Sequence, residues 1–146
     1  MKMNSEELLS KGMIEALDID SNLIKKTLTR GEKNLKSSKK IFKSEEYDWT
    51  LAVAYSAMLQ AGRALMFSKG YRPKGEFKHL SVIEFVHSEF GDKISSKMIR
   101  LFDNYRKKRN KIVYEEYDIV SEDEAEEAIK FADEFLNMVK KILKVA

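Results

Sequence analysis

The fold depends first on residues 51–69, which read LAVAYSAMLQAGRALMFSK. The first half of this stretch is small and apolar on nearly every side, a composition typical of a helix that neighbours contact on several faces. Ser44 or Asp48 is expected near the start of this helix, and Gly70 with Pro73 ends it near Lys69. The sequence therefore predicts a central helix that opens within residues 44–48 and runs to about Lys69.

A second long helix is predicted ahead of it, with several N-cap candidates between Asp18 and Ser21. Its apolar residues recur close to the helical period, at Ile24, Leu28, Leu35 and Phe42. Gly31 lies on this apolar side, where the missing side chain lets another helix approach closely. The opposite face of the predicted helix is rich in lysine.

Three more helices are predicted in the second half of the chain. A short one covers residues 79–90 and is ended by Gly91, and a longer one runs from Ile94 to about Glu116. The last begins with a capping box at residues 121–124 and continues to about Leu143. Strand is indicated only weakly, at residues 113–114 and 119–120.

The N-terminal residues 5–17 can form a short amphipathic helix with Ser5 as its N-cap. We assign residues 1–20 to an N-terminal arm and residues 21–146 to one helical domain. The predicted fold class is all-α, an up-and-down four-helix bundle with an additional short helix and the helical arm.

Length and composition agree with one such domain. A chain of 146 residues with 43% hydrophobic and 35% charged residues suits a single charge-rich helical protein with an adequate core. The absence of cysteine excludes disulfides and thiolate metal sites. Residues 1–17 contain glutamates where a signal peptide is apolar, and no apolar run approaches the ~20 residues of a membrane span, so a cytoplasmic protein without membrane contact is expected.

Charge is distributed unevenly along the chain. The net charge is only +3, yet residues 25–43 contain eight basic side chains against Glu32 alone, and residues 97–111 form a second basic cluster. Residues 122–127 are strongly acidic. Two interpretations remain open: these segments are solvated helix faces, or the basic ones form a surface that follows phosphates.

The candidate site lies in residues 105–117, which read YRKKRNKIVYEEY. Helical periodicity places Arg109 on the same stripe as Phe102, Tyr105 and Ile112, which should face the core or a partner. A guanidinium in such a position needs an acceptor, since burying it unpaired costs several kcal/mol. Arg109 is therefore either a member of a structural ion pair or part of an anion or phosphate site.

Two motifs resemble a known family. Residues 109–114, RNKIVY, resemble the Arg-Asn-x-x-x-His signature of HEPN domains, with Tyr114 where ribonuclease members have histidine. Residues 54–74 are similar to the Ala-Tyr-Tyr-Ala-Met-Phe helix of that family and to the turn after it. The resemblance covers residues 21–144 and implies a small helical bundle of the type associated with minimal nucleotidyltransferases. Family members often carry a histidine near the start of the short helix, where His79 is expected to cap or orient.

Three functions remain open, and the resemblance implies the first two. The first is an RNA-binding or nucleotide-binding module, with a minimal nucleotidyltransferase as its partner in a toxin–antitoxin-like system. The second is a metal-independent ribonuclease in which Arg109 holds the scissile phosphate and Tyr114 stands at the catalytic position. The third is a noncatalytic dimer or adaptor. The predicted binding residues are Arg106, Arg109, Asn110, Lys111, Tyr114 and Tyr117. No cofactor is expected, and no metal either, because His79 and His87 lie too far apart on one helix to chelate an ion.

Helix geometry suggests that the site needs two chains. Five residues correspond to a rotation of about 140°, so Arg109 and Tyr114 should point apart on a regular helix. Asn110, Tyr114 and Tyr117 share a face, and a two-fold partner can bring that face to Arg109. We therefore expect a homodimer formed through the helix at residues 94–117.

Overall fold

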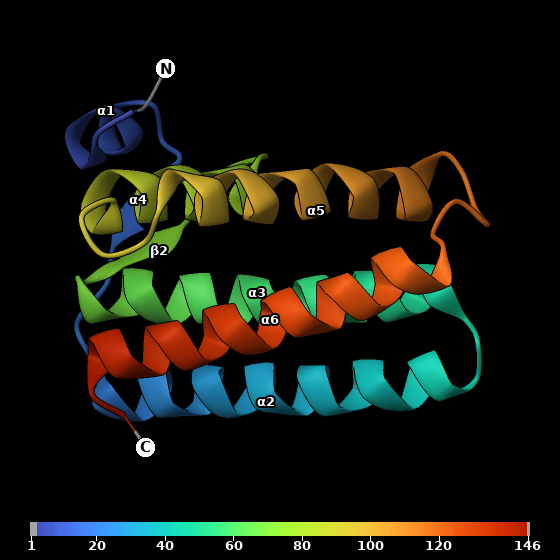
Figure 1. The fold of residues 1–146 in the computed structure, drawn as a ribbon. Coiled ribbons are helices and arrows are strands. Elements are labelled where there is room, and N and C mark those ends of the chain that lie inside the picture. Colours follow the sequence, from blue (N-terminus) through green and yellow to red (C-terminus); the bar gives the residue numbers. More distant parts are fainter. Residues whose placement is uncertain (1–2, 146) are drawn as a thin grey trace.

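The computed structural model describes residues 3–145, and within them the fold is helical (Figure 1). The elements are α1 Ser5–Ser10, β1 Ile14–Ala16, α2 Ser21–Lys43, α3 Tyr47–Ser68, β2 Tyr71–Pro73, α4 Lys78–Phe90, α5 Ser96–Tyr114 and α6 Glu122–Leu143. The predicted all-α class is confirmed, with four long helices, the short α4 and the α1 arm. Residues 1–2 of the predicted arm and residue 146 of the predicted domain lie outside the described residues.

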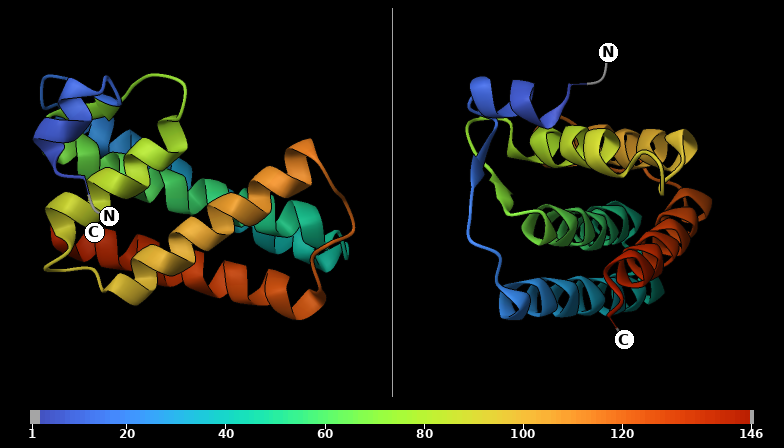
Figure 2. Two further views of the ribbon diagram at one scale, coloured as in Figure 1. Left: turned by 90° about the horizontal axis from the view of Figure 1, so that it is seen from above. Right: turned by 90° about the vertical axis from the view of Figure 1, so that its left-hand side faces the viewer.

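Helix α3 occupies the centre of the bundle, as its composition predicts. It contacts α2, α4, α5, α6 and β2. Figure 2 shows α2 beneath α3, α4 and α5 above it, and α6 along one side. The long helices α2, α3, α5 and α6 alternate in direction along the bundle (Figure 1). Side chains on the face of α3 toward α4 and α5 can therefore contribute to a site between those helices.

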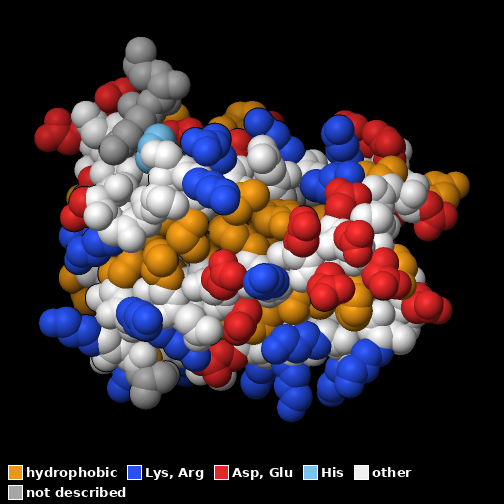
Figure 3. Space-filling view, in the orientation of Figure 1, with side chains coloured by type: hydrophobic (Ala, Val, Ile, Leu, Met, Phe, Trp, Pro, Cys, Tyr) orange, Lys and Arg blue, Asp and Glu red, His pale blue; other side chains and the backbone are white. Residues whose placement is uncertain are grey.

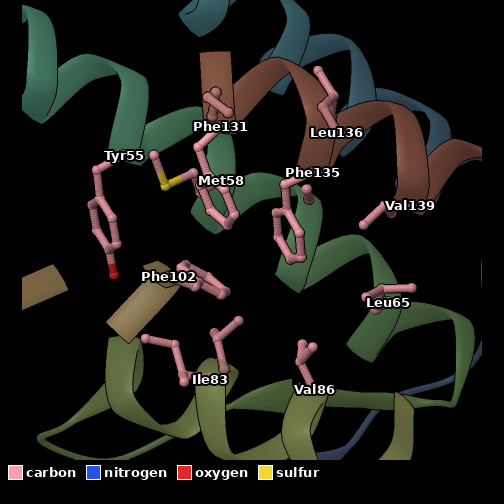
Figure 4. Close-up of a cluster of buried hydrophobic side chains, with 14 of the residues drawn as sticks. Tyr55, Met58, Leu65, Ile83, Val86, Phe102, Phe131, Phe135, Leu136 and Val139 are labelled. Carbon is pink, nitrogen blue, oxygen red and sulfur yellow. The ribbon is translucent and has the colours of Figure 1, made fainter. Parts of the chain in front are cut away.

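The core is built around aromatic side chains between α3, α5 and α6 (Figure 4). The ring centroid of Phe102 lies 5.1 Å from that of Phe135 and 6.0 Å from that of Tyr55, and both pairs are tilted. All three side chains are fully buried, and tilted pairs at these separations add to the energy of burial. This packing fixes α5 against α3 and so determines where the C-terminal half of α5 lies.

Most predicted helix ends are confirmed because their signals are local. The Asp20 carboxylate accepts from the Asn22 and Leu23 amides at the start of α2. Ser121 forms the predicted capping box with Glu124. Gly70 follows α3 with a φ of +83°, a conformation that favours glycine.

The start of α3 agrees with the prediction in that Asp48 lies in its first turn, but neither Ser44 nor Asp48 is the N-cap. Ser44 is the C-cap of α2, and Glu46 occupies the N-cap of α3 without a side-chain bond. The Asp48 carboxylate instead accepts from three backbone amides of the loop before α6, those of Asp118, Ile119 and Val120, at 2.6, 3.1 and 3.0 Å. Asp48 thus ties two segments that are distant in sequence.

The arm also differs from the prediction. The helix covers only Ser5–Ser10, with Asn4 rather than Ser5 as its N-cap. Gly12 then turns the chain at a φ of +69°, and β1 pairs antiparallel with β2, with Ala16 opposite Tyr71. Strand prediction at residues 113–114 and 119–120 was wrong, since the first pair ends α5 and the second lies in the loop held by Asp48. A pairing between segments this far apart leaves no local periodic signal.

Among residues 3–145, none of the helices combines the length and the apolar character that crossing a membrane requires.

Candidate functional site

Arg109 lies on the C-terminal half of α5 and is only partly buried. Its Nη1 donates to Asn110 Oδ1 over 3.3 Å, and it forms no salt bridge to any residue in the described part of the chain. Arg106, one turn earlier, differs, because its Nε donates to Asp103 Oδ1 at 2.8 Å. No carboxylate among residues 3–145 therefore pairs with Arg109, as a structural ion pair would require. Its guanidinium remains available to bind an anion.

Four of the six predicted binding residues border one groove of about 510 Å³ between α5 and the segment that leads into α4. Its lining is Gly75, Glu76, Phe77, Lys78, His79, Leu80, Arg106, Arg109, Asn110, Tyr114 and Glu115. Lys111 is exposed and does not border this groove. Tyr117 is 83% exposed and borders a different hollow, beside Trp49.

On a regular helix Arg109 and Tyr114 were expected to point apart, so that one chain could not bring both to one ligand. Both border the groove within a single chain. They are about 7.5 Å apart along the helix axis, and Tyr114 is the last residue of α5, so it reaches the groove at one end while Arg109 lies deeper in α5. Tyr114 is 75% exposed and can offer its ring to a ligand. A second chain is therefore not needed to place both side chains beside one groove.

His79 is the main addition that the structure makes to the predicted site. It lies in the first turn of α4, whose N-cap is Phe77, so His79 is not the cap. Its Nδ1 lies 3.3 Å from the Tyr55 hydroxyl of α3. Burial lowers the pKa of His79, and the charges of Arg109, Arg106 and Arg63 lower it further. Burial and the nearby cations thus both favour the neutral form of the imidazole.

Tyr55 contributes to the same arrangement from the core side. Burial raises the pKa of Tyr55 well above its ordinary value, although the charges of Arg106 and Arg109 oppose this effect. Its hydroxyl therefore stays protonated and can donate to an unprotonated Nδ1 of His79. In that tautomer Nε2 carries the ring proton and is a donor. In the other tautomer Nδ1–H donates to the Tyr55 oxygen, and Nε2 is an acceptor for other partners.

A second cavity of about 900 Å³ adjoins the groove and shares Gly75, Lys78 and His79 with it. Arg63 of α3 borders this cavity, together with Arg72 and Lys74 from β2 and the residue after it. Sequence reasoning included Arg63 in the motif of residues 54–74 without giving it a role. The available signal was an arginine within the otherwise apolar central helix.

The charge distribution of the surface follows the sequence. Figure 3 shows Lys and Arg side chains along the edge that α2 forms and Asp and Glu side chains over the start of α6. The lysines of α2 are exposed. Among residues 3–145 no three His, Cys, Asp or Glu side chains are grouped so that they could hold a metal ion. Positive charge is thus concentrated on α2 and beside the two cavities.

Similarity to known proteins agrees with these features. A protein of Methanocaldococcus jannaschii named "Putative toxin MJ0142" is 29% identical over 82% of this chain and 81% of its own length. "Putative toxin MJ0605" of the same organism is 32% identical over 77% of this chain and 83% of its own length. The family model described as HEPN domain matches residues 24–142, a range from the first turn of α2 almost to the end of α6. The chain therefore belongs to the HEPN domain family.

Proposed function

We propose that this protein is a toxin-like HEPN module that binds RNA in the groove beside Arg109. The observation that carries the proposal is a partly buried guanidinium that has no carboxylate partner in the described part of the chain, in a groove that Arg106 and Lys78 also border. Because an arginine presents a planar fork of donors, it suits two oxygens of one phosphate. The names of the two similar proteins support a toxin role.

The groove residues have distinct proposed roles. Arg109 binds the phosphate, and Asn110 orients the guanidinium by accepting from Nη1. Tyr114 offers an exposed ring on which a base can stack. Lys111 lies outside the groove and contributes only long-range attraction. Tyr117 is separated from the groove, so the ligand bound at Arg109 does not depend on it.

A metal-independent ribonuclease is the second candidate function, and the position of His79 favours it. In the tautomer whose Nδ1–H donates to the Tyr55 hydroxyl oxygen, Nε2 of the neutral imidazole is unprotonated and can accept the proton of a ribose 2′-hydroxyl. The 2′-oxygen then bonds to phosphorus, and the bond from phosphorus to the 5′-oxygen breaks. The 5′-oxygen then takes a proton from water, and the hydroxide that this leaves takes the proton from His79. Arg109 stabilises the charge on the phosphate during this step. His79 supplies the titrating group that this chain lacks at Tyr114, where the family motif has histidine.

We further propose that two chains associate through α5, and that a minimal nucleotidyltransferase is the physiological partner. Figure 3 shows a strip of hydrophobic side chains between α5 and α6. The partly buried apolar residues of these helices include Met98, Leu101, Tyr105, Ile129, Met138 and Ile142. Sedimentation at micromolar concentration should give a dimer, and a monomer would exclude a sizeable isologous interface. Co-purification with a co-expressed nucleotidyltransferase tests the partner.

Fluorescence anisotropy with labelled single-stranded RNA tests the main proposal. Arg109→Ala should weaken binding by about 1–3 kcal/mol, the range of a charge-assisted contact. The matched control is Arg100→Ala, which removes the same charge from an exposed position on α5 that borders neither cavity. Tyr114→Phe, which keeps the ring, should cost less than Tyr114→Ala. Equal losses in Arg109→Ala and Arg100→Ala would show that the groove does not bind the RNA.

Cleavage assays separate the binder from the enzyme. A ribonuclease that uses His79 should lose cleavage in His79→Gln and retain it in Tyr114→Phe, while both variants still bind RNA. The opposite pattern would assign the chemistry to the Tyr114 hydroxyl. If the RNA stays intact after long incubation with the wild type, the ribonuclease is excluded and RNA binding is the function that remains.

A further inference from the structure

The larger cavity, of about 900 Å³, has both a charged and an apolar part. Its basic lining consists of Arg63, Arg72, Lys74 and Lys78, and Glu15 is the one carboxylate that borders it. Its apolar lining includes Leu17, Leu23, Leu59, Phe67 and Val82. Cavities of this size that combine apolar walls with a few charged groups are typical of small-molecule and nucleotide sites.

Arg63 is the central charge of this cavity. It lies on α3, where it is half-buried, and burial lowers its pKa, with the nearby charge of Arg30 lowering it further. Its Nη1 donates to Gln60 Oε1 at 3.0 Å, and its guanidinium carbon lies 5.3 Å from the centre of the Phe67 ring. Neither neighbour carries a negative charge, so this partly desolvated cation retains donors for an anion.

The one carboxylate in the cavity does not neutralise Arg63. Glu15 Oε1 accepts from Arg72 Nε, and Glu15 Oε2 lies 3.6 Å from Lys74 Nζ. The pKa of Glu15 is lowered, first by the hydrogen bond from Arg72. Arg63 pairs with no carboxylate among residues 3–145. An anion from outside the chain can therefore satisfy Arg63 without displacing an existing ion pair.

The cavity continues into the Arg109 groove through a shared wall made by Gly75, Lys78 and His79. A chain of nucleotides that passes this wall meets Arg109 on one side and Arg63 on the other. In Figure 2, α3 lies in the layer next to the one that contains α4 and α5. Arg63 lies on α3 and Arg109 on α5, so each arginine is held in place by a different helix.

From this arrangement we propose that the Arg63 cavity is a second nucleotide subsite for single-stranded RNA. Arg63 binds the phosphate that neighbours the one held at Arg109, and the apolar wall at Leu59 and Val82 contacts the base. The inference rests on RNA binding at Arg109 and adds the length and strandedness of the ligand. A duplex cannot place a base against this wall, so the site requires unpaired nucleotides.

The test compares two labelled RNA ligands, a dinucleotide with a single phosphate and a hexanucleotide. Arg63→Gln should weaken hexanucleotide binding about tenfold and leave dinucleotide binding nearly unchanged, because the single phosphate occupies the Arg109 groove. Arg109→Ala should weaken both. Arg63→Gln should also reduce the slope of log K against log salt for the hexanucleotide by about 0.7, the change expected for one lost phosphate contact. Arg63→Lys should restore this slope.

The controls separate the two proposals. Arg100→Gln makes the same charge change away from both cavities, and circular dichroism verifies that each variant is folded. If the wild type binds both ligands and Arg63→Gln binds the hexanucleotide as tightly as Arg100→Gln does, the subsite is refuted while binding at Arg109 stands. If the wild type binds neither ligand, RNA binding at Arg109 fails and the subsite fails with it. Equal losses for both ligands in Arg63→Gln also refute a separate subsite.

Discussion

Two glycines that lie within helices allow the packing of the site to be tested by one substitution. A Cβ added at Gly62 of α3 lies 2.6 Å from Val82 Cγ1 and 3.3 Å from Phe102 Cε2. A Cβ added at Gly31 of α2 lies 3.2 Å from Leu136 Cδ1. Alanine in place of glycine favours each helix by about 1 kcal/mol, so this contribution is the same at both positions. The difference between the two variants therefore reports the contacts.

These contacts predict different changes in the free energy of unfolding for the two variants. Leu136 Cδ1 is the end of a flexible side chain and can move by a few tenths of an ångström, so Gly31→Ala should change the free energy of unfolding by less than about 1 kcal/mol. Val82 is β-branched and its Cγ1 cannot withdraw without a change of rotamer or a movement of α4. Overpacking of this kind costs about 1–3 kcal/mol or more. Gly62→Ala should thus be about 2 kcal/mol less stable than Gly31→Ala.

Urea unfolding followed by circular dichroism measures this difference directly. Gly62→Ala should also weaken RNA binding, because α4 carries His79 and Lys78, whereas Gly31→Ala should bind normally. Equal stabilities of the two variants would refute the inference that α3 and α4 are in contact at the limit of close packing. Unchanged RNA binding in a destabilised Gly62→Ala would show that the groove tolerates movement of α4.

Two further substitutions test other parts of the structure. Asp48→Ala should lower the free energy of unfolding by about 2 kcal/mol and the melting temperature by about 4–8 °C, since three backbone amides lose a charged acceptor; an unchanged melting temperature would contradict the role of Asp48 in holding the loop. The lowered pKa of His79 means that the unfolded chain binds its proton more readily, so the wild type should lose stability as the pH falls below about 6.5. His79→Gln should lose less over the same interval, and identical pH profiles of the two proteins in urea unfolding would contradict this.

The sequence was sufficient for those features whose causes are local. The capping box at Ser121 and the stop at Gly70 are short patterns, and the four long helices follow from periodic apolar positions. The position of Asp48 near the start of α3 was predictable, but its role was not, because the amides that donate to it are 70 to 72 residues away. The pairing of β1 with β2 was missed for the same reason, since neither three-residue segment has a detectable period.

The candidate site was predictable only in part. Arg109 was identifiable because an arginine on an apolar stripe contradicts the pattern around it, and the structure leaves it without a carboxylate. The approach of His79 to Arg109 depends on how α4 crosses α5, which no single segment encodes. The role of Arg63 could not be predicted for another reason. That Arg63 has no ion-pair partner in its cavity becomes evident only from the structure, in which Glu15 pairs with Arg72.

The concentration of positive charge beside His79 carries a consequence for stability. Arg63, Arg106 and Arg109 all lower the pKa of His79, and of these three only Arg106 has a carboxylate partner within residues 3–145, Asp103. Such uncompensated cations repel one another, and a ligand phosphate relieves that repulsion. Arg109→Gln should therefore be at least as stable as the wild type at low salt without RNA. Saturating RNA should raise the melting temperature of the wild type far more than that of the variant. If, without RNA, Arg109→Gln unfolds at a clearly lower temperature than the wild type, then Arg109 has a structural role. That result would favour the noncatalytic adaptor over the RNA-binding module.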